Sequence, residues 1–149
     1  MTSDQYSDAA HRVKVSVFGT GSLGKEHARI YAELARSGAV DFVGVYDVAA
    51  EPARKIAEKY GVRAFGSAGE AAAASEAVSV VTPTTTHFEL ARRLLAEGRH
   101  VLVEKPMTHD AAQAAELVET ARQKGCVLQV GHVERFNPVF AYLQTVATE

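Results

Sequence analysis

Apolar residues gather in six short runs along the chain, each bounded by polar or glycine-containing stretches. Five of these runs are rich in β-branched residues, and the sixth, at residues 62–65, is weaker. Because β-branched and aromatic residues favour strands, the pattern predicts six strands. The runs are VKVSVF (13–18), FVGVY (42–46), VRAF (62–65), VSVV (78–81), VLV (101–103) and VLQV (127–130).

Between the predicted strands, the apolar positions change to the i, i+3, i+4 spacing of a helix face, and we expect each stripe to cover the sheet. Glycines that suit a left-handed helix end follow four helical stretches. The alanine-rich segment 69–77 predicts a short helix without chemistry. The stripes are His27, Ile30, Tyr31 and Leu34, then Phe88, Ala91, Leu94 and Leu95, and the glycines are Gly38, Gly61, Gly98 and Gly125.

Most of the strand runs are continuously apolar, which is typical of parallel strands covered by helices on both faces. Strand and helix alternate to the end of the chain without an internal repeat. This pattern predicts an α/β fold with a doubly wound parallel sheet, a Rossmann fold of about six strands in the order 3-2-1-4-5-6. We assign residues 13–131 to this domain and expect ligands at the carboxyl ends of its strands.

The composition favours a soluble domain that binds small molecules. The chain has 149 residues, of which 47% are apolar and 23% charged, with a formal net charge of −2. The charges are scattered, so we expect neither a nucleic-acid nor a membrane partner. Cys126 is the only cysteine, and the polar segment 1–12, an expected flexible tail, lacks the apolar core of a signal peptide. A cytoplasmic location is therefore predicted.

A glycine-rich segment, GTGSLG, follows the first predicted strand and precedes a helix. In this context Gly19 permits a tight turn, Gly21 lets the backbone approach a pyrophosphate, and Gly24 lets helix and strand pack closely. The amides of the helix N-terminus then point at the phosphates. An ordinary glycine-rich turn is the alternative. The predicted cofactor-binding residues here are Gly19, Thr20, Gly21, Ser22, Leu23 and Gly24.

Two further strand ends supply candidate cofactor contacts. Asp47 lies at the distance from the glycines expected of the acid that binds an adenosine ribose, and Val48 rather than an arginine follows it, which favours NAD over NADP. The alternative is that Asp47 caps the next helix. After the fourth strand, Thr82, Pro83 and Thr84 would form a wall with His87 near the cofactor. The alternative is a solvated His87 behind an N-cap at Thr85 or Thr86.

The fifth strand runs directly into Glu104, Lys105 and Pro106. Its carboxyl end lies at the same edge as the glycine loop, so a carboxylate and a cation would face the cofactor site. Pro106 disfavours the helical region for Lys105. The sequence equally allows a surface ion pair at a strand end.

In order and spacing, these segments resemble the N-terminal half of the Gfo/Idh/MocA oxidoreductase family. The matching segments are GTGSLGKEHAR, Asp47, TPTTTH, EKP and GHVERFNP, between Val13 and Pro138. The resemblance implies a catalytic role for Lys105, beside the nicotinamide and the substrate hydroxyl, and a cofactor contact for Glu104. The segment VGHVERFNP also resembles the corresponding segment of family members that are nucleotide-sugar dehydrogenases.

Residues beyond the sixth strand complete the predictions. His132 would lie near the nicotinamide, whereas Arg135 and Asn137 would tie the following crossover to the core. No metal site is expected, since the remaining histidines show no ligand spacing. The segment 132–149 would be the crossover and the start of a second, substrate-binding domain that family members have and this chain lacks.

The resemblance implies an NAD-binding domain of an oxidoreductase that acts on a sugar, a nucleotide sugar or an inositol-like alcohol. We expect the chain alone to be catalytically incomplete. A stand-alone NAD-binding or regulatory module without catalysis is the alternative. The helical stripe of Val139, Tyr142, Leu143 and Val146 predicts a homo-oligomer through the C-terminal segment.

Overall fold

The computed structural model describes residues 11–147. Strands and helices alternate along the chain, and each of the six predicted runs overlaps a strand. The elements are β1 (Val13–Phe18), α1 (Ser22–Arg36), β2 (Val40–Tyr46), α2 (Ala50–Tyr60), β3 (Arg63–Ala64), α3 (Ala68–Ala74), β4 (Ala77–Val80), α4 (Thr84–Ala96), β5 (His100–Val103), α5 (Ala111–Lys124), β6 (Leu128–Val130), the short 3₁₀ helix η1 (Val133–Phe136) and α6 (Pro138–Val146).

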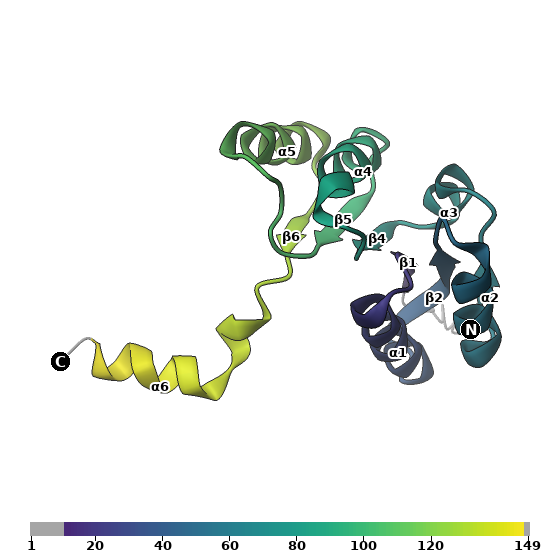
Figure 1. The fold of residues 1–149 in the computed structure, drawn as a ribbon, viewed down its shortest axis with the longest axis horizontal. Coiled ribbons are helices and arrows are strands. Elements are labelled where there is room, and N and C mark those ends of the chain that lie inside the picture. The colour runs from purple at the N-terminus through teal and green to yellow at the C-terminus, as the bar shows by residue number, and fades with distance from the viewer. Residues whose placement is uncertain (1–10, 148–149) are drawn as a thin grey trace, which may run out of the picture.

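The six strands form one sheet in the order β3-β2-β1-β4-β5-β6, and every pair is parallel. The predicted fold class and strand order are therefore confirmed. Helices α1 and α2 cover one face, while α3, α4 and α5 lie on the other (Figure 1). The strand order reverses between β1 and β4, and a crevice at the carboxyl ends of these two strands is where ligands bind in this fold.

Each face of the sheet has its own apolar core. One core joins β1 and β2 to α1 and α2, and includes Val17, Val45 and Ile56. The other joins β4 and β5 to α3, α4 and α5, and includes Val80, Leu95 and Leu117. Burial on both faces explains why the central strands read as continuous apolar runs.

The predicted stripe of α1 was wrong in two of its four positions. Ile30 is 45% and Leu34 is 37% exposed, whereas the buried positions of α1 are Gly24, Ala28 and Ala32. These small residues let the helix axis approach the sheet closely, and the larger side chains turn outward. The stripe predicted for α4 is confirmed, because Ala91, Leu94 and Leu95 are buried and Phe88 packs against the same core.

The predicted glycines lie at the helix ends as expected. The start of α4, however, is capped by neither Thr85 nor Thr86. All four predicted glycines have positive φ, with Gly61 and Gly125 as the caps of α2 and α5. At the start of α4, Pro83 is the N-cap and no side chain caps the helix. The Thr86 hydroxyl instead donates to the Pro83 carbonyl, so the N-cap predicted at Thr85 or Thr86 was wrong.

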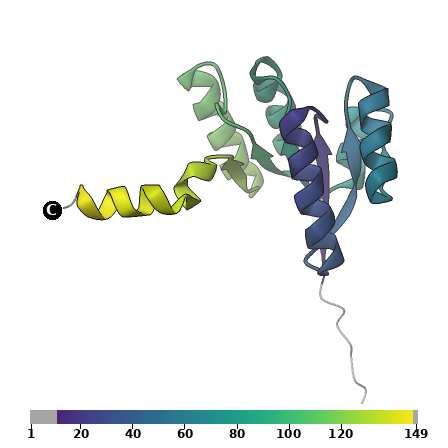
Figure 2. The ribbon, with the colours of Figure 1, turned by 60° about the horizontal axis from the view of Figure 1, so that its bottom comes forward.

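Beyond β6, the chain leaves the sheet. Figures 1 and 2 show α6 extending away from the other helices. Asn137 caps α6 by accepting from the Val139 N–H and donates to Glu134. Arg135 is exposed. The prediction that Arg135 and Asn137 tie the crossover to the core was therefore wrong, because the contacts of Asn137 are local.

At the other end of the chain, the predicted flexible tail of residues 1–12 falls almost wholly outside the described residues. The two that are described contact the domain: His11 lies 2.8 Å from Glu76, and Arg12 lies 3.1 Å from Asp41. Within residues 11–147, no helix has the length and apolar character needed to span a bilayer.

Candidate functional site

The glycine loop joins β1 to α1, and its three glycines have different geometric roles. Gly19 has a φ of 96°, and a Cβ there would lie 2.4 Å from the Val81 carbonyl oxygen. A Cβ on Gly24 would lie 2.0 Å from the Gly19 oxygen, so the first turn of α1 packs directly on the loop. At Gly21 a Cβ would meet nothing within 4 Å. The backbone at Gly21 is thus open to a ligand.

The N-terminus of α1 suits a bound anion. Gly21 is its N-cap, no side chain caps the helix, and no acidic residue occurs in the first turn. The first amides of a helix lack partners within the helix and carry its positive dipole end. A pyrophosphate fits these donors because it brings the negative charge that the first turn lacks.

Asp47, directly after β2, binds the glycine loop that follows the neighbouring strand β1. Its Oδ2 accepts the Thr20 N–H at 2.7 Å and the Thr20 hydroxyl at 2.8 Å, and its Oδ1 accepts the Ala49 N–H at 2.9 Å. Burial raises the pKa of Asp47, but the hydrogen bonds from Ala49 and Thr20 outweigh it and place the pKa below its ordinary value. The group is therefore a carboxylate at neutral pH.

The alternative role predicted for Asp47 was a cap of α2. Its carboxylate does accept the Ala49 N–H, but Ala49 itself is the N-cap of α2 and no side chain caps that helix. Through its contacts with Thr20, Asp47 links the ends of β1 and β2.

A cavity of about 840 Å³ lies between the glycine loop, the end of β2 and the first turns of α4. Six of its lining residues were predicted as cofactor contacts: Gly19, Gly21, Asp47, Val48, Thr82 and Pro83. Sequence reasoning missed Tyr46, Ala68, Val81, Thr85, Thr86, Glu89 and Leu90. The last four form the side of α4 next to its buried stripe, and the same helical period that identified the stripe also places them together.

His87 lies behind this cavity rather than in its lining. The side chain is 1% exposed and belongs to the buried side of α4. Its Nε2 lies 2.8 Å from the Thr82 carbonyl oxygen and its Nδ1 lies 2.9 Å from that of Pro106. His87 thus links the loop after β4 to the loop after β5, and the alternative of a solvated histidine was wrong.

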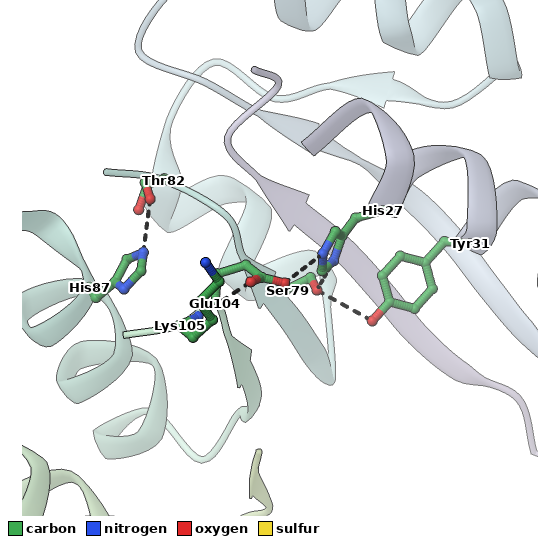
Figure 3. A network of polar contacts seen from close by, with 7 residues as sticks. All are labelled: His27, Tyr31, Ser79, Thr82, His87, Glu104 and Lys105. Atoms are coloured by element: carbon green, nitrogen blue, oxygen red, sulfur yellow. Dashed lines mark hydrogen bonds and ion pairs between the residues drawn. The ribbon is translucent and has the colours of Figure 1, made fainter. Parts of the chain in front are cut away.

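Glu104 and Lys105 do not form a surface ion pair. Glu104 is 6% exposed, and its Oε1 lies 3.0 Å from Nε2 of His27 on α1. His27 Nδ1 in turn lies 2.9 Å from the Ser79 hydroxyl oxygen, and Tyr31 donates to the same oxygen (Figure 3). The Lys105 side chain is exposed, and the backbone N–H of Lys105 donates to Glu104 Oε2.

This network connects the helix of the glycine loop to the strand end that carries the lysine. Glu104 is turned toward His27 on α1 and is not among the residues that line the cavity. The Lys105–Pro106 peptide bond is cis. Gly131, after β6, leaves room for the Glu104 carboxylate, because a Cβ there would lie 2.6 Å from Oε1.

The remaining predicted positions lie apart from the cavity lining. Ser22 and Leu23 are exposed at the start of α1, Thr84 begins α4, and His132 is exposed after β6. Among residues 11–147, no group of three or more His, Cys, Asp or Glu side chains is arranged to hold a metal ion.

A parallel sheet in this order, a glycine loop that leaves Gly21 open, and a carboxylate at the end of β2 together define a dinucleotide-binding Rossmann domain. The family described as "Oxidoreductase family, NAD-binding Rossmann fold" (GFO_IDH_MocA) matches residues 13–132. The chain belongs to this family, as the resemblance implied.

Relatives of the chain include several dehydrogenases. It is 39% identical over 132 residues to UDP-N-acetylglucosamine 3-dehydrogenase of Acidithiobacillus ferrooxidans, covering 89% of this chain and 41% of that protein. A solved structure of that enzyme has a TM-score of 0.83 and covers 91% of this chain and 44% of its own. Inositol 2-dehydrogenase of Rhizobium meliloti is 36% identical, covering 86% of this chain and 38% of that protein.

The structure of GenD2 from gentamicin A biosynthesis, in complex with NAD, has a TM-score of 0.76 and 34% identity. The match covers 81% of this chain and 34% of GenD2. The chain thus spans about two fifths or less of the length of these relatives.

Proposed function

We propose that the chain is the NAD-binding part of an oxidoreductase that moves a hydride between the nicotinamide and a carbinol carbon. The cavity between Gly21 and Asp47 carries this proposal, because it combines an open backbone, a helix N-terminus and a carboxylate at the spacing a dinucleotide needs. The substrate class that we propose is a sugar, a nucleotide sugar or an inositol-like alcohol, in keeping with the names of the similar dehydrogenases.

The preferred cofactor is NAD rather than NADP. A 2′-phosphate next to the Asp47 carboxylate would meet a like charge, and the residues that line the cavity include Glu89 but neither lysine nor arginine. Val48, which follows Asp47, is 91% exposed and offers no cation. Repulsion without a compensating cation disfavours the phosphate.

Lys105 is the proposed catalytic residue. When bound, the nicotinamide supplies the hydride acceptor or donor. The Lys105 ammonium, carried at the end of β5 on the Glu104-anchored loop, would stabilise the substrate oxygen as negative charge develops there. Proton transfer from that oxygen would be completed by a further group that faces the nicotinamide.

We further propose that the 149 residues bind NAD without turning substrate over. Lys105 is exposed, and in this proposal a further surface is needed to hold the substrate against it at hydride-transfer distance. Positioning contributes about 7 to 11 kcal/mol to lowering a barrier, so its loss costs several orders of magnitude in rate. Cofactor binding depends on the glycine loop and Asp47 and does not need the surface that holds the substrate.

Calorimetric titration with NAD and NADP tests the proposal. We expect measurable NAD affinity, weaker NADP affinity, and no NADH formation from UDP-sugars, free sugars or inositols. Asp47→Ala should weaken NAD binding by about 1 to 3 kcal/mol through lost charged hydrogen bonds. NADP affinity equal to or above that for NAD would contradict the assigned role of Asp47.

The alternative is a non-catalytic module. To distinguish it from the proposed oxidoreductase, activity is measured in a longer protein in which a substrate-binding domain follows residue 149. If that protein turns over, Lys105→Ala should lower kcat far more than it weakens NAD binding. Full activity in the Lys105→Ala variant would remove the catalytic role. Rapid turnover by the 149 residues alone would contradict the proposed division between binding and catalysis.

A further inference from the structure

Thr20 lies inside the glycine loop, yet its side chain does not face the cavity. The residue is 1% exposed and is absent from the cavity lining, although its neighbours Gly19 and Gly21 are both part of it. Both donors of Thr20, the backbone N–H and the hydroxyl, reach the same atom, Oδ2 of Asp47. Thr20 therefore contacts Asp47 rather than the cavity.

The hydrogen bonds of Asp47 limit what the carboxylate can still accept. A carboxylate has about four lone-pair sites, two on each oxygen. Thr20 fills both sites of Oδ2, and the Ala49 N–H fills one site of Oδ1. One site on Oδ1 remains for a ligand.

We propose that Thr20 is a positioning residue that fixes Asp47 so that its carboxylate accepts a single hydroxyl of the adenosine ribose. This inference rests on the proposed function, that the cavity binds NAD. It adds two points. Only one of the two ribose hydroxyls binds the Asp47 carboxylate, and Thr20, which does not touch the cofactor, sets the strength and selectivity of that hydrogen bond.

The physical gain is preorganisation. A free Asp side chain samples several rotamers and must be ordered when the ligand binds, which reduces affinity. Donors from the loop after β1 and from Ala49 after β2 hold the carboxylate before the cofactor arrives. The same donors keep the pKa of Asp47 low, so the negative charge that opposes a 2′-phosphate is present and fixed in place.

The test compares Thr20→Val with Thr20→Ser. Valine has nearly the shape of threonine and keeps the backbone N–H but lacks the hydroxyl, whereas serine keeps the hydroxyl. Thermal unfolding first establishes that both variants fold. Each protein is then titrated by calorimetry with NAD, with NADP, and with NAD whose adenosine ribose lacks the 2′ or the 3′ hydroxyl.

In the wild-type chain, we expect removal of one hydroxyl to weaken binding about tenfold or more, as for a lost hydrogen bond to a charged group, and removal of the other to change it by less than about threefold. Thr20→Val should bind NAD several-fold more weakly, discriminate less against NADP, and respond more evenly to the two deoxy analogues, because Oδ2 has a free site. Thr20→Ser should behave as wild type.

A measurement without cofactor tests the contact between Thr20 and Asp47 by itself. Carbon-13 NMR titration of the Asp47 carboxyl should show a higher pKa in Thr20→Val than in wild type or Thr20→Ser, because a donor to the charged form is lost. An unchanged pKa would overturn the inference.

Two binding results would also overturn the inference while leaving the proposed function in place. One is equal loss of affinity for both deoxy analogues in the wild-type chain, and the other is wild-type NAD affinity and selectivity in Thr20→Val. A chain that binds neither dinucleotide would contradict the proposed function itself, and the inference with it.

Discussion

The carboxylate of Glu104 is held between His27 on one side and the backbone of Gly131 on the other. Its Oε1 lies 3.0 Å from His27 Nε2, and a Cβ on Gly131 would come within 2.6 Å of the same atom. Gly131 is therefore required by space around a buried polar group. A larger residue there must displace the carboxylate from its hydrogen-bond partner.

We expect Gly131→Ala to destabilise the fold by about 1 to 3 kcal/mol, the usual cost of overpacking a filled site. Urea unfolding measures this change. The matched test is the same substitution in a Glu104→Ala background, where the added methyl group has room and should cost clearly less. Equal costs in the two backgrounds would show that Gly131 and Glu104 are not coupled.

Asp47 gives the stability of the domain a pH dependence on the acid side. Its pKa is lower in the folded chain than in the unfolded chain, so its contribution is fully present above the unfolded value of about 3.9 and is lost as the pH falls through the folded value. Asp47→Asn should therefore destabilise the chain more at pH 7 than at about pH 2. Urea midpoints that differ by the same amount at both pH values would contradict this expectation.

For individual residues, the sequence identified the candidate functional side chains but not all of their hydrogen-bond partners. It identified Glu104 and Lys105 from their unusual place after a strand, and it identified Asp47 from its spacing to the glycines. It could not pair Glu104 with His27, because the two are 77 residues apart and only the packing of α1 on the sheet brings them together. Nor could spacing show that Thr20 faces Asp47.

At the scale of elements, the glycine loop and α1 form one unit in which Gly24 and Gly21 have opposite requirements. A Cβ on Gly24 would lie 2.0 Å from the Gly19 oxygen, whereas a Cβ on Gly21 would meet nothing within 4 Å. Gly24 lets the helix pack on its own loop. Gly21 leaves space in front of the helix N-terminus.

Alanine at these two positions should therefore have different effects. Gly24→Ala should lower stability, because the helix must move away from the loop, and should weaken NAD binding as well. Gly21→Ala should leave the urea midpoint nearly unchanged and still weaken NAD binding, because the methyl group occupies the space proposed for the pyrophosphate. Wild-type NAD affinity in Gly21→Ala would contradict the proposed cofactor position.

The faces of the helices show where periodicity is a sufficient guide and where it is not. On α4, large apolar residues face the core, so the stripe of Leu94 and Leu95 was predicted correctly. On α1, the sheet-facing positions are small, and Ile30 points outward. A prediction from periodicity assigns the largest apolar side chains to the buried face of a helix. Where a helix lies close to the sheet, however, the buried positions hold glycine and alanine.

On the scale of the whole molecule, the strand order and the position of the crevice follow from the alternation of strands and helices, and both were predicted from sequence. The direction of the C-terminal segment was not. Every residue of α6 is exposed, including Val139 at 60%, Tyr142 at 68% and Leu143 at 51%. These side chains form the apolar stripe expected from the sequence, and it lies on a helix that extends away from the sheet (Figure 2).

An uncharged helix with an exposed apolar stripe favours association, because burial of that stripe removes apolar surface from water. We therefore expect the 149-residue chain to self-associate through α6 with increasing concentration, as measured by light scattering. Leu143→Lys places a charge within the stripe and should shift the equilibrium to monomer, whereas Gln144→Lys adds the same charge outside the stripe and should not. If the wild-type chain stays monomeric at high concentration, α6 instead packs back onto its own domain, and Leu143→Lys should then lower the stability of the monomer rather than change its mass.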